Sequence, residues 1–251
     1  MGVFMEFIGH GMLGFGHPPA WASYFGVVGI GHGTAFALMS PVGIFDIITG
    51  LIVLLAPIRG VVLYMALWGL WTALLRPLAG ESLWEAVERA GNYGAPFGLF
   101  LISMGGGWRN WLGFHQEAPL TGLRLEALSW TLRLTTVLLL LGHGLLGLYV
   151  HKPLYAAQYA SVGLGWPGLE PSIGAFECLL AVAVLVRPAR QLLIGIVIWK
   201  LASEALNPIA GSPLWVFIEH GGSYAAPLAL ACLARDYDEA GASRLNRGAT
   251  A

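Results

Sequence analysis

Long apolar segments alternate with short polar ones along the whole chain, and this pattern predicts eight membrane-spanning helices. A helix needs roughly 17–25 mostly apolar residues to cross the hydrocarbon core of a bilayer. Several segments are shorter than this, so we expect their ends to extend into the membrane interface. The predicted spans, four in each half, cover about residues 1–16, 41–56, 60–75, 83–104, 129–150, 171–186, 191–206 and 214–234.

Weaker aromatic and glycine-rich segments lie between the first two spans of each half, at residues 19–31 and 153–165. Such segments are typical of short interfacial or re-entrant helices. Residues 105–128 are polar and predict a cytoplasmic connector between the halves. Residues 236–251 are also polar, and we expect them to form a mobile C-terminal tail.

One stretch occurs twice, because residues 77–96 return as residues 208–227. Both copies keep the frame P-[LI]-A-G-x-x-L-W-x-x-[VI]-E-[RH]-[AG]-G-x-Y-[GA]-A-P at a constant offset of 131. The same offset relates the second and third spans of the halves, and an offset of 133 relates the first spans. Self-similarity at a fixed spacing indicates a duplicated structural unit. We therefore predict an all-α fold of two four-helix repeats, at residues 1–104 and 129–235.

The number of spans and the basic residues predict the topology. Four spans per half is an even number, so both halves enter the membrane from the same side and form a parallel repeat. Only Arg76 and Lys152 fall on one face, and the other face holds most of the arginines, which the positive-inside rule places in the cytoplasm. We expect a multi-pass protein of a bacterial-type inner (plasma) membrane with both termini cytoplasmic. The cytoplasmic arginines are Arg59, Arg109, Arg124, Arg187, Arg190, Arg235, Arg244 and Arg247, with Arg133 near them.

Composition supports the membrane class. Hydrophobic residues make up 57% of the chain and charged residues 11%, with a mean hydropathy of +0.70, whereas a soluble domain has about 25% charged residues. The expected partner is the lipid bilayer, and a net charge of −1 gives no reason to propose nucleic acid. Cys178 and Cys232 are far apart in apolar runs and suggest neither a disulfide framework nor a CxxC site. The first residues lack a basic segment and a cleavage site, so we expect a retained first span.

Two histidines occupy equivalent positions in the first span of each half, where His10 and His143 are both flanked by glycines. An ionisable side chain inside a bilayer costs roughly 2.5–3.5 kcal/mol on insertion scales, so each needs a partner or a purpose. Two imidazoles placed by a pseudo-two-fold axis could bind haem b as cofactor-binding residues and iron ligands. Alternatively, each imidazole bonds a carbonyl or carboxylate of a neighbouring helix.

Two pairs of acids also recur, and they are the candidate catalytic residues: Asp46 with Glu177, and Glu88 with Glu219. A histidine and two acids in each half suffice for a proton relay or for a polar pocket around a quinone headgroup. Tyr93 and Tyr224 follow the second pair by five residues and could join such a site. The alternative is a hydrogen-bonded polar layer that only holds the helices together.

Other charges have possible partners on their own helix. Glu85 with Arg89, and Lys200 with Glu204, are four residues apart, and we expect each pair to neutralise itself. Arg89 and His220 occupy equivalent positions, so the two halves have diverged there.

Three motifs recur in each half: G-x-x-x-x-G followed by an aromatic segment, an acid among small residues, and a Pro-x-Arg turn. They lie at residues 9–25, 43–50 and 57–59, and again at 142–159, 174–177 and 188–190. In these motifs each half resembles the DoxX-like family, small four-helix membrane proteins that include the DoxD subunit of thiosulfate:quinone oxidoreductase. The resemblance implies two fused units, a membrane redox system with quinone-linked electron transfer, and a partner redox subunit. Of the candidate site residues, the resemblance to the family covers only the acid of the second motif, which is Asp46 or Glu177.

The leading hypothesis is therefore a membrane component of an oxidoreductase system that holds a quinone or haem in an intramembrane polar pocket. A proton-coupled small-molecule transporter and a non-catalytic membrane scaffold are the alternatives. The sequence has no G-x-G-x-x-G loop, Walker motif or CxxC motif, which argues against self-contained redox or ATP chemistry.

Overall fold

The structure is a computed structural model that describes residues 1–104, 111–113 and 122–248, with side chains described up to residue 234. Every regular element in these ranges is helical. The elements of the first half are α1 (Gly2–Phe15), α2 (Trp21–Val27), α3 (His32–Leu55), α4 (Arg59–Leu78), α5 (Leu83–Glu88) and α6 (Ala90–Ser103). Those of the second half are α7 (Leu123–Leu145), the π-helical turn η1 (Leu146–Val150), α8 (Pro153–Ala160), α9 (Leu169–Val186), α10 (Arg190–Ile209), α11 (Leu214–Glu219) and α12 (Gly221–Gly248).

Five helices are long and apolar enough to cross a membrane: α3, α4, α7 continued by η1, α9 and α10. The all-helical class is confirmed, and these helices are compatible with a membrane protein. The first predicted span, α1, has only 14 residues and a length of about 21 Å at 1.5 Å per residue. The fourth and eighth predicted spans are each divided into two helices.

Several predicted boundaries were wrong. The second span begins at His32, and Pro41, which was predicted to begin it, lies inside α3. Membrane helices tolerate an internal proline because neighbouring helices and local adjustments satisfy the freed backbone groups. The fifth span begins at Leu123, within the predicted connector. The predicted polar tail continues α12 as far as Gly248. The rest of the connector, at 105–110 and 114–121, and residues 249–251 lie outside the described residues.

The fourth helix of each half breaks at equivalent positions. Arg89 separates α5 from α6 with φ −83° and ψ 19°, and His220 separates α11 from α12 with φ −81° and ψ 18°. The starts of α6 and α12 touch each other, since a Cβ added to Gly91 would lie 2.8 Å from the backbone nitrogen of Ser223. Backbone N–H groups of two helix starts are thereby placed inside the protein.

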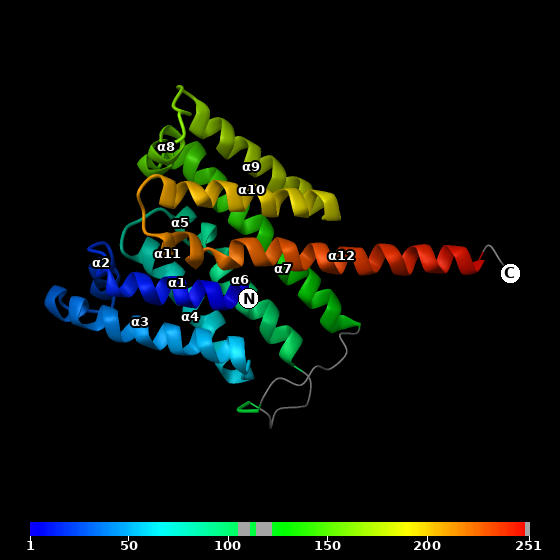
Figure 1. Ribbon diagram of the computed structural model, residues 1–251, viewed down its shortest axis with the longest axis horizontal. Coiled ribbons are helices and arrows are strands. Elements are labelled where there is room, and N and C mark those ends of the chain that lie inside the picture. The colour runs from blue at the N-terminus through cyan, green and yellow to red at the C-terminus, as the bar shows by residue number, and fades with distance from the viewer. Residues whose placement is uncertain (105–110, 114–121, 249–251) are drawn as a thin grey trace.

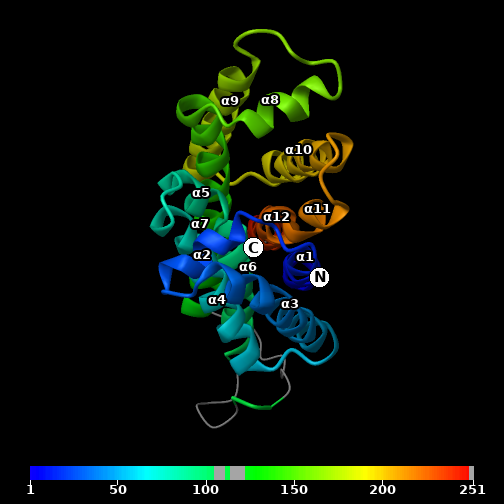
Figure 2. The ribbon, with the colours of Figure 1, turned by 90° about the vertical axis from the view of Figure 1, so that its left-hand side faces the viewer.

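The centre of the molecule is shared by the two halves. Helices α1, α6, α7 and α12 contact one another there, and α3, α4, α9 and α10 pack outside them. Figure 2, viewed from one end, shows α1, α6 and α12 near the middle, with α3 and α4 on one side and α9 and α10 on the other. In Figure 1 the short elements α2, α5, α8 and α11 gather at one end, the N-terminus lies near the middle, and the C-terminus lies at the opposite end.

Close helix contacts at glycine cross from one half to the other. A Cβ added to Gly9 of α1 would lie 2.3 Å from the backbone nitrogen of Glu219, at the end of α11. A Cβ added to Gly142 of α7 would lie 2.1 Å from that of Glu88, at the end of α5. Small residues let membrane helices approach this closely. The first helix of each half therefore brings its histidine next to the broken helix of the other half.

Candidate functional site

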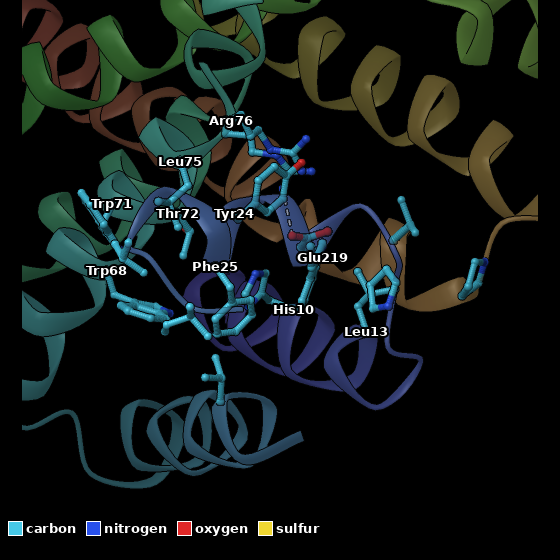
Figure 3. A pocket seen from close by; sticks show the side chains of 18 residues that line it. His10, Leu13, Tyr24, Phe25, Trp68, Trp71, Thr72, Leu75, Arg76 and Glu219 are labelled. Carbon is cyan, nitrogen blue, oxygen red and sulfur yellow. Dashed lines mark hydrogen bonds and ion pairs between the residues drawn. The ribbon is translucent and has the colours of Figure 1, made fainter. Parts of the chain in front are cut away.

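A cavity of about 490 Å³ lies between α1, α2, α4 and α11. Most of its lining is aliphatic or aromatic, and the rings come from Trp21, Tyr24, Phe25, Trp68 and Trp71. Its polar and charged lining residues, besides Tyr24, are His10, Thr72, Arg76, Arg89 and Glu219. Figure 3 shows Tyr24, Arg76 and Glu219 on one side of the cavity and Trp68 and Trp71 on the other. An apolar pocket with a few convergent polar groups is the usual form of a small-molecule site.

His10 is held in one orientation at the wall of this cavity. Its Nδ1 lies 2.8 Å from Oδ2 of Asp46, whose side chain is fully buried. Its ring stacks on Trp21, with the ring centroids 4.6 Å apart. A carboxylate at Nδ1 fixes the tautomer and the ring orientation of a histidine. The other nitrogen, Nε2, is then the one left for a bound molecule.

Arg89 and Glu219 form an ion pair that joins the two halves at the cavity. The Arg89 Nη1 atom lies 2.8 Å from Glu219 Oε1, and both residues line the cavity. The expected pairing of Arg89 with Glu85 was wrong, because the helix break separates them. Glu85 instead lies 2.8 Å from Nζ of Lys152 and 3.7 Å from Nη1 of Arg76.

A tyrosine, an arginine and a glutamate form a second polar group on the cavity wall. The Tyr24 hydroxyl donates to Oε1 of Glu81, and Arg76 donates to Oε2 of the same carboxylate at 3.2 Å. The Arg76 guanidinium lies over the Tyr24 ring. Burial above all raises the pKa of Tyr24 to about 12, so its hydroxyl remains a donor at physiological pH.

The equivalent place in the second half is closed. His143 Nδ1 bonds Oε2 of Glu177, and the His143 ring packs on Tyr155 with centroids 4.4 Å apart. Trp199 Nε1 donates to the other oxygen of Glu177 at 2.8 Å. The space around His143 has no room even for a water molecule.

A buried charge cluster fills the interior beside this second histidine. Lys200 Nζ lies 2.9 Å from Oε1 of Glu204 and 4.0 Å from Oε1 of Glu177, which confirms the predicted Lys200–Glu204 pair. His220 Nδ1 lies 2.9 Å from Oε2 of Glu204. All four side chains are more than nine-tenths buried. The charges thus compensate one another inside the protein.

The structure brings together some of the predicted site residues and separates others. His10 and Glu219 line the cavity, with Asp46 directly behind His10. His143 does not line this cavity, so the cavity beside His10 is not the bis-histidine haem site considered from the sequence. Among the described residues no group of three or more possible metal ligands occurs. The remaining predicted residues lie outside the cavity: Glu177 beside His143, Glu88 against α7, Tyr93 against the apolar core, and Tyr224 with its hydroxyl on the Phe217 carbonyl at 3.0 Å.

Arg89 and Glu6 were not among the predicted site residues, because neither is kept at the equivalent position of the other half. Arg89 was assigned a local partner, although glycine-interrupted segments at matching positions, such as Arg89-Ala90-Gly91, are a known signal of a binding site in membrane proteins. Glu6 has leucine, Leu139, at its equivalent position and was therefore overlooked. Its place inside an apolar span was the signal that could have identified it.

The comparisons with known proteins identify no relative. No protein-family model matches the chain, and neither a curated protein nor a solved structure matches it. The likeness to the DoxX-like family therefore rests on the three short motifs alone.

Proposed function

We propose that the chain is a membrane component of an oxidoreductase system that binds a quinone in the cavity beside His10. One observation carries this proposal. An aromatic-lined cavity of about 490 Å³ meets an oriented histidine–carboxylate pair and the Arg89–Glu219 ion pair. The same arrangement does not recur in the second half, where the equivalent space is filled.

A quinone suits this cavity chemically. Its flat ring is apolar and stacks on tryptophan and phenylalanine, and its two carbonyl oxygens accept hydrogen bonds. The guanidinium of Arg89 is a donor at the cavity wall, and His10, whose Nδ1–H donates to Asp46, also donates from Nε2 when its ring is protonated. When the quinone is reduced by electrons from a partner redox subunit, each of its oxygens needs a proton, and an oriented histidine is an effective proton donor.

The proposal includes the membrane arrangement expected from the sequence. Eight crossings result if α1, α5 with α6, and α11 with α12 are added to the five long apolar helices. The matched helix breaks and the matched glycine contacts support two repeats that face the same way. Both termini are then cytoplasmic, in a bacterial-type inner membrane. The resemblance to DoxX-like proteins supports the redox role.

Purified protein in lipid nanodiscs provides the test. A lipid extract examined by mass spectrometry should contain quinone, and a short-chain quinone should quench tryptophan fluorescence on titration. We expect Trp68→Phe to weaken binding about tenfold, or about 1.4 kcal/mol. Trp199→Phe, the matched change in the closed half, should leave the affinity unchanged.

Absence of quinone from the extract together with absence of quenching would overturn the quinone proposal. A Soret band in the absorption spectrum would point to haem instead. Equal losses of affinity in Trp68→Phe and Trp199→Phe would show that the cavity is not the binding site.

A second candidate function is a proton-coupled permease, and the broken helices favour it. Interrupted helices at matching positions of two repeats commonly form substrate sites in transporters, and here the breaks are at Arg89 and His220. The corresponding test is uptake into proteoliposomes driven by a proton gradient. Under this function Glu219→Gln abolishes uptake, because it removes the acid that pairs with Arg89 at the cavity.

A further inference from the structure

Glu6 is a buried acid without a side-chain partner. It lies on α1 with 2% of its surface exposed, and its carboxylate faces the backbone N–H of Gly222 and is bonded by no side chain among the described residues. The carboxylate lies against the start of α12, where a Cβ added to Gly222 would be 1.7 Å from Oε1. A buried carboxyl group without a cation partner is much less costly as the neutral acid than as the carboxylate. Glu6 is therefore suited to hold a proton inside the protein.

A small cavity of about 20 Å³ lies beside Glu6, between α1, α4 and α6. Its polar lining residues are Glu6, His10, Trp68, Thr72 and Asn92. Trp68 Nε1 is also buried without a hydrogen-bond partner. A cavity needs about 10–15 Å³ and two to four polar partners to hold one water molecule. The small cavity meets both requirements.

The small cavity continues the large one toward the interior. His10, Trp68 and Thr72 line both cavities, so the oriented imidazole stands between the large cavity and Glu6. The second half has no equivalent, because leucine replaces Glu6 and Lys200 occupies the position of Gly69. Leu139 is fully packed, with 1% of its surface exposed.

We propose that Glu6 is an internal proton donor to the cavity, connected to His10 through one water molecule bound to Trp68 Nε1. This inference rests on the proposed quinone function. His10 begins as the imidazolium, with its Nδ1–H on Asp46. As the quinone gains electrons from a reduced flavin or iron–sulfur partner, Nε2 of this imidazolium gives its proton to a quinone oxygen. The water then protonates Nε2 and takes a proton from Glu6. In sum, Glu6 loses one proton and the quinone oxygen gains one.

The charged and titratable groups around Glu6 are consistent with this role. Glu219 on α11 is the nearest other acid, and Arg89 already neutralises it. On α3, Asp46 is engaged by His10. The remaining groups on the elements packed against α1 are the amino terminus, Tyr93 on α6 and Tyr224 on α12. Among the described residues no lysine or arginine forms an ion pair with Glu6.

The test uses the full chain in nanodiscs, with a short-chain quinone and a chemical reductant. Glu6→Gln keeps the shape of the side chain, and Glu6→Leu copies the residue found in the second half. Both variants should bind quinone with an affinity within about twofold of the unmodified protein, because Glu6 does not line the large cavity. Both should slow proton-coupled reduction about 10²-fold, the usual contribution of a positioned acid.

Infrared difference spectra provide a second measurement that a merely structural role would not change. On quinone reduction, the unmodified protein should lose the carbonyl band of the protonated Glu6 carboxyl group. Glu6→Gln lacks this carboxyl group, so its difference spectrum should show no such loss. Glu126→Gln, a control at an exposed acid on α7, should behave as the unmodified protein does. Intact binding with unchanged rates and spectra in both Glu6 variants overturns the proton-donor role alone. If the unmodified protein binds no quinone, the proposed function itself fails.

Discussion

In the first half His10 and Asp46 lie beside a cavity of about 490 Å³, whereas in the second half His143 and Glu177 lie beside a closed cluster of buried charges. Both pairs occupy equivalent positions of the repeated sequence pattern, and each joins a histidine Nδ1 to a carboxylate oxygen. The histidine–carboxylate pair therefore does not by itself define a site. What differs is the space next to it.

The interior next to the two histidines also differs. Gly69 and Ala73 of α4 correspond to Lys200 and Glu204 of α10. At Gly69 the backbone of α6 lies against α4, with the Asn92 carbonyl oxygen 2.2 Å from the position of an added Cβ, whereas α10 carries the long charged pair. At the helix break, Arg89 corresponds to His220, which turns to Glu204 rather than to a cavity. The two halves thus differ in the polar groups that lie next to the break.

The largest expected effect is on the stability of the closed half. We expect Glu204→Gln to lower the free energy of unfolding by about 3–5 kcal/mol, because it leaves Lys200 and His220 buried without their shared carboxylate. Unfolding in a detergent titration measures this. Glu81→Gln at the open half breaks a partly exposed pair with Arg76 and should cost at most about 1 kcal/mol.

A double variant tests whether Glu204→Gln is destabilising because it leaves the Lys200 cation buried without its carboxylate. Lys200→Met with Glu204→Gln should be less destabilised than Glu204→Gln alone, because the unpaired cation is also removed. Equal destabilisation of the single and double variants would contradict the compensated-cluster interpretation.

The next effect concerns the glycines that join the halves. Gly9→Ala and Gly142→Ala each place a methyl group against backbone atoms of the opposite half, and we expect a loss of about 1–3 kcal/mol from either. Only Gly9→Ala should also weaken quinone binding, because it displaces Glu219. Gly195→Ala, where the added methyl group meets nothing within 4 Å, is the control. Thermal unfolding and quinone titration of the three variants decide between these outcomes.

A smaller effect is expected at the ion pair of the open site. Arg89→Gln removes a hydrogen-bond donor and unpairs Glu219, and we expect quinone affinity to fall about tenfold, or about 1.4 kcal/mol. Arg89→His copies the second half and should weaken binding as well. Unaltered affinity in both variants would mean that the ion pair lies away from the bound molecule.

The smallest expected effect is on the free energy of unfolding, and it comes from the one methylene group by which glutamate is longer than aspartate. Glu177 reaches Trp199 Nε1, but Asp46 is shorter, so its Oδ1 has no hydrogen-bonded partner and no side chain bonds Trp68 Nε1. We expect Asp46→Glu to gain about 1 kcal/mol by bonding Trp68 Nε1 in place of the water proposed there, and Glu177→Asp to lose a similar amount. Unfolding measurements and the emission spectrum of Trp68 report the change. A loss of stability in Asp46→Glu would contradict this explanation.

Much of the architecture was predictable from the chain alone. Apolar segment length indicates helices in a membrane, and the repeated frame around Glu88 and Glu219 indicates a duplication, because both signals are local in sequence. The histidine–carboxylate contacts were among the alternatives considered. The predicted Lys200–Glu204 pair needed only the spacing of one helical turn.

Tertiary structure alone decided the site. Because the helix breaks at Arg89, this side chain pairs with Glu219, which is 130 residues away, and not with Glu85, which is four residues away. No local sequence pattern predicts this pairing. Likewise, the equivalent segments of two similar halves predict two similar sites, yet the cavity of about 490 Å³ lies beside His10, whereas the space at His143 is too small for a water molecule. The volume left between helices depends on how side chains from several elements fit together. Sequence therefore determined which helices form, and packing determined where a ligand has room.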